Sequence, residues 1–99
     1  MTDFYDAIRR VWKVSFPNLE SLQEDVFSGY YDLEELNLPN LVTLGDRALE
    51  GCRSLKEVSF PKVATVGEEV FYDCSSLVKA HLPLATSIGE DVFVNCNKF

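Results

Sequence analysis

The sequence is short of basic residues. It carries nine Lys and Arg residues against sixteen Asp and Glu residues, and its formal net charge is −7. Nucleic acids and anionic membranes bind to basic surfaces, so this charge balance argues against direct binding to either. We therefore expect neither a nucleic acid nor a membrane among the partners of this chain.

Long apolar runs are also missing. A membrane-spanning helix needs about 20 consecutive apolar residues, and no stretch of the chain has that length. Residues 1–14 lack the apolar core of a secretory signal, and no N-x-S/T glycosylation site is present. We expect a cytoplasmic protein, or a cell-surface protein if this chain is a fragment of a longer one.

Motifs for catalysis and for cofactor binding are absent as well. The chain has no phosphate-binding glycine loop, no G-x-S-x-G, no H-E-x-x-H and no paired C-x-x-C. It has one histidine, His81, and a catalytic role for it would need a nucleophile nearby. We expect no enzymatic activity, no catalytic residue and no cofactor.

Cysteine is scarce, and its three copies are evenly spaced: Cys52, Cys74 and Cys96. One interpretation is a metal site or a disulfide, and the other is a buried ladder in which each cysteine acts as a small apolar residue. The odd number argues against complete disulfide pairing, and one histidine is little help in completing a zinc site. The sequence favours the buried ladder and no metal.

What the chain does have is a repeat of 22 residues. Sliding the sequence by this length aligns residues 11–32, 33–54, 55–76 and 77–98 without a gap, and Phe99 then opens a fifth copy. Prolines occupy one column of the alignment: Pro17, Pro39, Pro61 and Pro83. Self-similarity at a fixed period is the signature of a solenoid, so one domain of stacked coils is expected.

Each part of the repeat predicts a local structure. The L-x-x-L-x-L stretch alternates apolar and polar residues, as a strand does, and the following proline ends it. Residues 42–44 form a second extended run, and Gly45 allows a turn. A short helical turn is expected next, with acidic residues at its positive end. Its C-cap column holds residues that tolerate a left-handed backbone: Gly29, Gly51, Asp73 and Asn95.

Stacking the coils aligns the strands in parallel and buries one apolar face. The prediction is an α/β solenoid of four coils, with a parallel strand face and short helical turns opposite. Eight columns point inward, represented in the second coil by Leu33, Leu36, Leu38, Leu41, Leu44, Ala48, Leu49 and Cys52.

The repeated pattern L-x-x-L-x-L-P-x-x-x-x-L-G-x-x-A/V-F/L-x-x-C-x-S resembles the BspA-like (Treponema-type) leucine-rich repeats. The resemblance covers residues 11–99 and is most specific in the third and fourth copies. It weakens in the first copy, where Gln23 replaces the glycine and Tyr30 the cysteine. It implies a curved, β-rich solenoid that binds proteins or surfaces, and it implies no enzymatic activity.

The two ends of the array differ from its middle. In residues 1–10, Thr2 or Asp3 can cap a short helix, so we expect a helical cap over the first coil. At the other end the fourth coil presents an unpaired strand edge, which invites self-association.

The outward side of the strands is one candidate binding surface. Solenoids bind partners through such faces, and its outward columns mix both charges with polar groups. Cross-strand pairs such as Lys13 with Glu35 would also stabilise it slightly. The candidate partner-binding residues here are Trp12, Lys13, Asn37, Glu57, Lys79 and His81.

A second candidate surface is a line of acids before the expected helical turns, which we name the acidic rail. Its members are Glu24, Asp25, Asp46, Glu68, Glu69, Glu90 and Asp91. The structural interpretation is that these acids complement helix dipoles. The functional interpretation is a negative strip that docks a basic partner.

Three functions remain open at this stage. The first is a non-enzymatic protein-interaction module that uses the strand face. The second is a small acidic inhibitor, of the mobile-element type, that imitates nucleic acid and blocks a basic enzyme with its rail. The third is a fragment of a surface adhesin.

Overall fold

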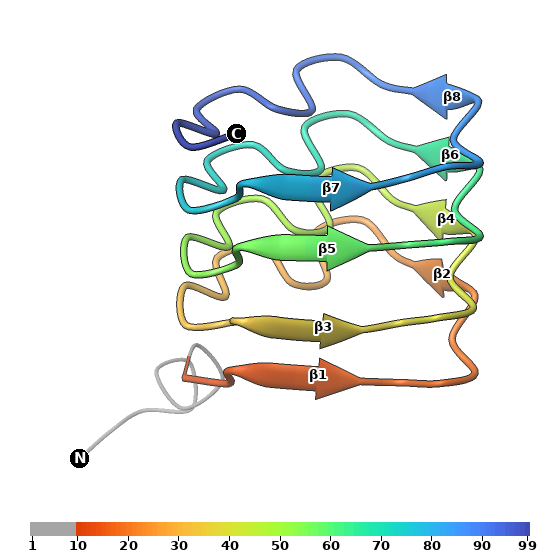
Figure 1. Ribbon diagram of the computed structural model, residues 1–99, viewed down its shortest axis with the longest axis horizontal. Coiled ribbons are helices and arrows are strands. Elements are labelled where there is room, and N and C mark those ends of the chain that lie inside the picture. Colours follow the sequence, from red (N-terminus) through yellow and green to blue (C-terminus); the bar gives the residue numbers. More distant parts are fainter. Residues whose placement is uncertain (1–9) are drawn as a thin grey trace.

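Short strands recur every 22 residues in residues 10–99, the part of the chain that the computed structural model describes. The three-residue strands are β1 (Lys13–Ser15), β3 (Glu35–Asn37), β5 (Glu57–Ser59) and β7 (Lys79–His81). The two-residue strands are β2 (Ser21–Leu22), β4 (Thr43–Leu44), β6 (Thr65–Val66) and β8 (Ser87–Ile88). Figure 1 shows the two sets as separate parallel stacks, which confirms a parallel-strand β-solenoid. The cap expected in residues 1–10 lies outside the described residues, apart from Arg10.

We name the strands of the first set the front strands and those of the second set the rear strands. The rear strands form one continuous ladder in the order β2-β4-β6-β8. The front strands form two separate pairs, β1 with β3 and β5 with β7. The ladder is thus complete on one side of the solenoid and interrupted on the other.

The expected helical turns are not present in residues 10–99, so the α/β prediction is wrong for this part of the chain. In the first of these segments, Asp25 N–H donates to Asp46 and Phe27 N–H donates to Ala48 in the next coil, at 3.0 and 2.9 Å. The intervening amide of Val26 donates locally to Gln23, at 3.3 Å. A helix uses every amide within itself, whereas these segments use alternate amides to form a third ladder between coils.

Two columns of these turn segments have a left-handed backbone. The predicted column is confirmed, with positive φ at Gly29, Gly51, Asp73 and Asn95. A second column, four residues earlier, also has positive φ, and sequence reasoning missed it: Asp25, Arg47, Glu69 and Asp91. Each turn segment therefore contains two left-handed residues four positions apart, and such residues do not fit a continuous right-handed helix.

The glycines after the rear strands stand where a side chain would be hindered, as the sequence predicted, but the hindrance does not come from a left-handed backbone. Gly45, Gly67 and Gly89 do not have positive φ. A Cβ at Gly45 would lie 2.7 Å from the Leu22 carbonyl oxygen, and one at Gly67 would lie 2.8 Å from the Asp46 nitrogen. The side chain is excluded because the main chain of the preceding coil touches this position.

The core follows the predicted inward columns in residues 33–76, whereas Phe16, Val26 and Ile88, which the pattern placed inward in the outer coils, are exposed. In the second coil seven of the eight predicted inward residues are buried, and Leu36 alone is partly exposed. No polar or charged residue in residues 10–99 is buried. Charged side chains therefore lie on the surface of the coils, where they form the two candidate binding surfaces.

Candidate protein-binding surface

The strand face presents its polar columns to solvent, as the alternation predicted. All eight outward side chains of the front strands are exposed, including Lys13, Asn37, Glu57, Lys79 and His81. Two cross-strand contacts order the first pair of strands. Lys13 Nζ lies 3.7 Å from Glu35 Oε2, and Asn37 Nδ2 donates to Ser15 Oγ at 3.1 Å.

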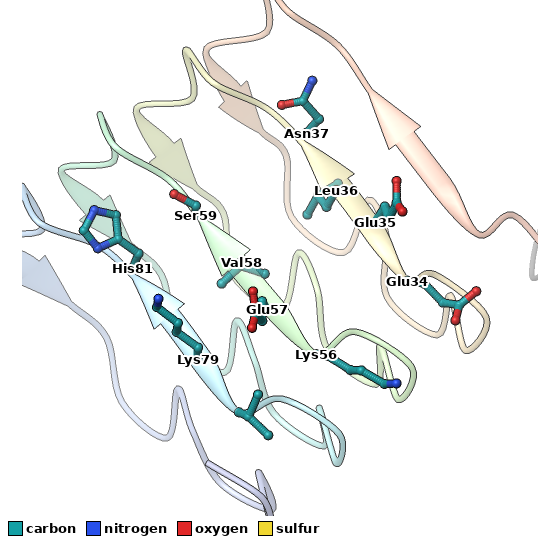
Figure 2. Close-up of a pocket in the computed structure, with 11 residues that line it drawn as sticks. Glu34, Glu35, Leu36, Asn37, Lys56, Glu57, Val58, Ser59, Lys79 and His81 are labelled. Atoms are coloured by element: carbon teal, nitrogen blue, oxygen red, sulfur yellow. The ribbon is translucent and has the colours of Figure 1, made fainter.

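An open groove of about 750 Å³ crosses this face over β3, β5 and β7. Figure 2 shows the side chains of these strands along it. The groove is lined by Glu34, Glu35, Leu36, Asn37, Lys56, Glu57, Val58, Ser59, Val78, Lys79 and His81. The structure thus brings together four of the six residues predicted for the strand face.

The groove lies over the interruption of the front ladder. In the paired strands β5 and β7, the amides of Val78 and Lys79 donate to the Lys56 carbonyl, at 2.8 and 3.4 Å. The equivalent bonds from Lys56 and Glu57 to the Glu34 carbonyl are not formed within residues 10–99. Main-chain donors and acceptors therefore remain along both edges of the gap.

Trp12 lies beside this groove and does not line it. Its side chain is 54% exposed, and it borders a separate shallow depression with Arg10, Asp32, Glu34 and Ser54. Glu34 lines both hollows and so connects Trp12 to the groove. The exposed position of this aromatic side chain is the kind that anchors protein interfaces.

Sequence reasoning missed Glu34 and Lys56 as members of the surface. They precede the front strands in the same column as Trp12 and Val78, and all four are exposed. The signal was available, because this column is apolar at its ends and charged in the middle. A second missed feature is Arg53, whose guanidinium carbon lies 4.9 Å from the Tyr31 ring centroid.

The acidic rail is exposed or half-buried along its length. One cation crosses it, since Arg47 Nε donates to Asp25 Oδ1 at 2.9 Å and Arg47 Nη2 to Glu24 Oε1 at 2.6 Å. The hydrogen bond to Asp25 and then the nearby negative charges raise the pKa of Arg47 above its ordinary value. Within residues 10–99 no salt bridge involves the rail acids from Glu68 onward.

Helix dipoles do not explain the rail, because the segments that carry it are not helices in the described part of the chain. Glu50 lies close to these acids and was not predicted. Burial, and then the charges of Glu69 and Asp25, raise the pKa of Glu50 above its ordinary value. Negative charge is therefore crowded on this side of the solenoid.

The cysteines form a structural ladder. The Cys52 thiol donates to the Phe27 carbonyl at 3.4 Å and the Cys74 thiol to the Leu49 carbonyl at 3.2 Å, in each case in the preceding coil. Burial raises the pKa of Cys52 to about 12 and raises the pKa of Cys74 further. Cys96 repeats the same contact at the surface. All three are free thiols, and their low acidity makes the two buried ones poor nucleophiles.

Neither a histidine–cysteine pair nor a metal site is formed within residues 10–99. His81 lies on the front strands and the cysteines lie in the turn segments, so the structure does not bring them together. Within residues 10–99 no three His, Cys, Asp or Glu side chains gather closely enough to hold a metal ion. A membrane-spanning helix is not found among the described residues.

Comparison with known proteins agrees with the geometry of the coils. A family model described as BspA type leucine rich repeat region matches residues 2–99, in six copies. Our division into four repeats of 22 residues therefore remains a prediction. No curated protein and no solved structure matches the chain. On the solenoid described above and this match over nearly its whole length, the chain belongs to the BspA-type leucine-rich repeat family.

Proposed function

We propose that this protein is a non-enzymatic interaction module that binds a protein partner through its strand face. The observation that carries the proposal is the groove over β3, β5 and β7, which gathers exposed side chains from three coils. Leucine-rich repeats generally mediate protein interactions, and solenoids do so through extended surfaces of this kind.

The charges of the groove support a macromolecular partner. Glu57, Lys56 and Lys79 make no salt bridge within residues 10–99. Unpaired charges around a partly apolar floor, here Leu36 and Val58, match the polar rim and apolar centre of protein interfaces. The exposed Trp12 beyond the end of the groove extends the surface that a partner would cover.

Affinity capture from a lysate of the source cells, followed by mass spectrometry, tests this proposal. Wild type is compared with a strand-face variant (Glu57→Ala, Lys79→Ala, His81→Ala) and a rail variant (Glu68→Lys, Glu69→Lys, Glu90→Lys, Asp91→Lys). We expect the strand-face variant alone to lose the partner, once circular dichroism has shown both variants to be folded. Retention of the partner by the strand-face variant would contradict the proposal.

The acidic rail supports a second candidate, a small acidic inhibitor that blocks a basic nucleic-acid-binding enzyme. The observation in its favour is that the turn segments are not helices, so helix dipoles do not account for Glu68, Glu69, Glu90 and Asp91, which make no salt bridge within residues 10–99. In the capture experiment this candidate requires a nucleic-acid enzyme that only the rail variant loses. Its affinity should also fall steeply as salt rises, because exposed charges are screened over about 8–10 Å.

Self-association through the last coil is a further proposal. Leu84, Ile88 and Phe99 there are 57%, 53% and 59% exposed, and apolar exposure beside a strand edge favours pairing. Sedimentation velocity over a range of concentrations should reveal larger species as concentration rises. A single monomeric species at the highest concentration would contradict this.

A further inference from the structure

The hollow beside Trp12, which we name the Trp12 hollow, joins an exposed aromatic ring to two exposed carboxylates. Its volume is about 620 Å³, and the side chains that line it come from two successive coils: Arg10, Trp12, Asp32, Glu34 and Ser54. Leu33 is fully buried, whereas Asp32 and Glu34 on either side of it are exposed. Both carboxylates therefore lie on the outer side of the chain, at the edge of the hollow.

Hydrogen bonds between the coils hold the walls of this hollow in place. The amide of Glu34 donates to the Trp12 carbonyl at 2.8 Å, so the indole and this carboxylate belong to residues that are bonded side by side in adjacent coils. Ser54 Oγ donates to the carbonyl of Tyr31, the residue before Asp32, at 2.6 Å. The stacking of the coils therefore fixes the walls of the hollow before any partner binds.

The charges of the Trp12 hollow favour one further cation. Asp32 and Glu34 make no salt bridge within residues 10–99, and Arg10 is the one cation among the five lining residues. Two carboxylates and one guanidinium give the hollow a net negative charge. A cation over an indole ring is attracted by its π electrons, so the exposed Trp12 and the carboxylates favour the same kind of group.

The neighbouring residues show which cation suits this corner of the solenoid. The Arg53 guanidinium lies over the Tyr31 ring at 4.9 Å, and these two residues directly precede Ser54 and Asp32 in the sequence. A guanidinium is planar and weakly hydrated, so it stacks on aromatic rings and binds carboxylates with two parallel hydrogen bonds. The ammonium group of lysine is strongly hydrated and has no such plane. The corner therefore favours arginine over lysine.

We infer that the Trp12 hollow receives an arginine side chain of the partner protein, with its guanidinium over the indole ring and beside Asp32 and Glu34. Glu34 lines both this hollow and the groove of the strand face, so one partner can cover the two together. The inference rests on the proposed function, because it names the group that anchors the same partner at one end of its binding surface.

Fluorescence of Trp12 tests the ligand directly, since this is the only tryptophan in the chain. We would titrate capped tripeptides with Arg, Lys or citrulline between two glycines; citrulline has the shape of arginine without its charge. The Arg peptide should produce a saturable change and bind about three- to thirtyfold more tightly than the citrulline peptide, given the usual size of a cation–π contact and an exposed ion pair. The inference is overturned if the Arg peptide gives no saturable change or binds no more tightly than the citrulline peptide. The Lys peptide should bind more weakly than the Arg peptide, and equal binding would overturn the choice of arginine.

The variant Asp32→Asn/Glu34→Gln removes both carboxylates and keeps Trp12 as the reporter. It should lose most of the preference for the Arg peptide over the citrulline peptide, and a full preference in this variant would contradict the inference. Glu68→Gln/Glu69→Gln is the matched control, because it removes the same charge from the acidic rail, and it should keep the wild-type preference. An equal loss in the two variants would mean that the net charge of the protein, and not the hollow, selects the Arg peptide.

Capture from the lysate separates this inference from the proposed function. Asp32→Asn/Glu34→Gln should weaken capture of the partner that the strand-face variant loses. If this hollow variant keeps the partner at full yield while the strand-face variant loses it, the strand face binds without the hollow and this inference alone is wrong. If the strand-face variant keeps the partner, the proposed function is wrong, and the peptide titration alone decides whether the hollow binds arginine.

Discussion

The front and rear strands stack the same coils and yet differ in continuity. The rear strands carry Ser21, Thr43, Thr65 and Ser87 at their outward positions, and their ladder runs through all four strands. The front strands carry Lys13, Glu35, Glu57 and Lys79 there, and their ladder stops between the strand of Glu35 and the strand of Glu57. Small neutral residues can lie opposite one another in any order, whereas charged residues stabilise a strand pair only when the opposite residue has the other charge.

The comparison shows that the hydrogen bonds that hold the coils together lie mainly outside the front strands. The coils are joined by the rear ladder and by the third ladder of the turn segments, so the front can lose one set of hydrogen bonds without losing the stack. A surface that is not needed to hold the coils together is free to carry chemically diverse side chains. We expect four changes to show which side of the solenoid holds the coils together, the first with the largest effect and the last with the smallest.

Gly67→Ala should damage the supporting side most. Its Cβ would lie 2.8 Å from the Asp46 nitrogen and 3.0 Å from the Gly45 carbonyl carbon, so the rear ladder must shift. We expect a loss of about 1–3 kcal/mol in the free energy of unfolding, measured by urea denaturation. Gly29→Ala is the control, because that Cβ meets nothing within 4 Å and adds only left-handed strain, costing about 1 kcal/mol. A larger loss at Gly29 would contradict the explanation from close packing.

Alkaline pH should weaken the turn ladder next. Burial in the folded state raises the pKa of the Cys52 thiol from 9.0 to about 12. The contribution of the protonated thiol to the stability of the fold is therefore fully present below pH 9 and is lost as the pH rises toward 12. Each such thiol should cost about 1.4 kcal/mol per pH unit in that window. This cost is measured by following the thermal unfolding of wild type and of Cys52→Ala from pH 8 to pH 11, in steps of about one pH unit. The variant should lose stability less steeply, and parallel slopes would contradict the assignment.

Placing like charges on neighbouring rear strands tests the comparison most directly. Thr43→Glu/Thr65→Glu places like charges between β4 and β6, and we expect it to cost about 0.2–1 kcal/mol. The amides of Ala64 and Thr65, which donate to Val42, should exchange faster with deuterium. Thr43→Glu/Thr65→Lys carries the same bulk with opposite charges and should leave this exchange unchanged. Equal exchange in the two variants would mean that charge does not decide continuity.

Lys13→Met should have the smallest effect. Lys13 and Glu35 are exposed, and exposed ion pairs contribute about 0–1 kcal/mol. We expect a change of less than about 0.5 kcal/mol in urea denaturation, with β1 and β3 still paired. A loss above that size would mean that the front ladder supports the coils after all.

The solenoid and its inward columns could be predicted because each repeat fixes them locally, through the proline that ends a strand and the apolar alternation before it. The helical turns could not be judged correctly from one copy. Whether an amide such as Asp25 N–H bonds within its segment or to Asp46 depends on the neighbouring coil. Glu69 and Arg47 gave no local sign of a left-handed backbone, since neither residue type favours it.

The candidate site was predictable in part. Exposure of Asn37, Glu57, Lys79 and His81 followed from the alternation of the strands. The groove did not, because it arises from how neighbouring coils pair and not from any single strand.

The glycine contacts give the array a direction of growth. At Gly45, Gly67 and Gly89, the atoms nearest to an added Cβ all belong to the preceding coil. A gene duplication that inserts a copy of residues 33–54 behind another coil supplies the glycine that the new junction needs. A copy of residues 11–32 in the interior would press Gln23 against main chain, so the array can lengthen by duplicating its glycine-bearing coils and not its first.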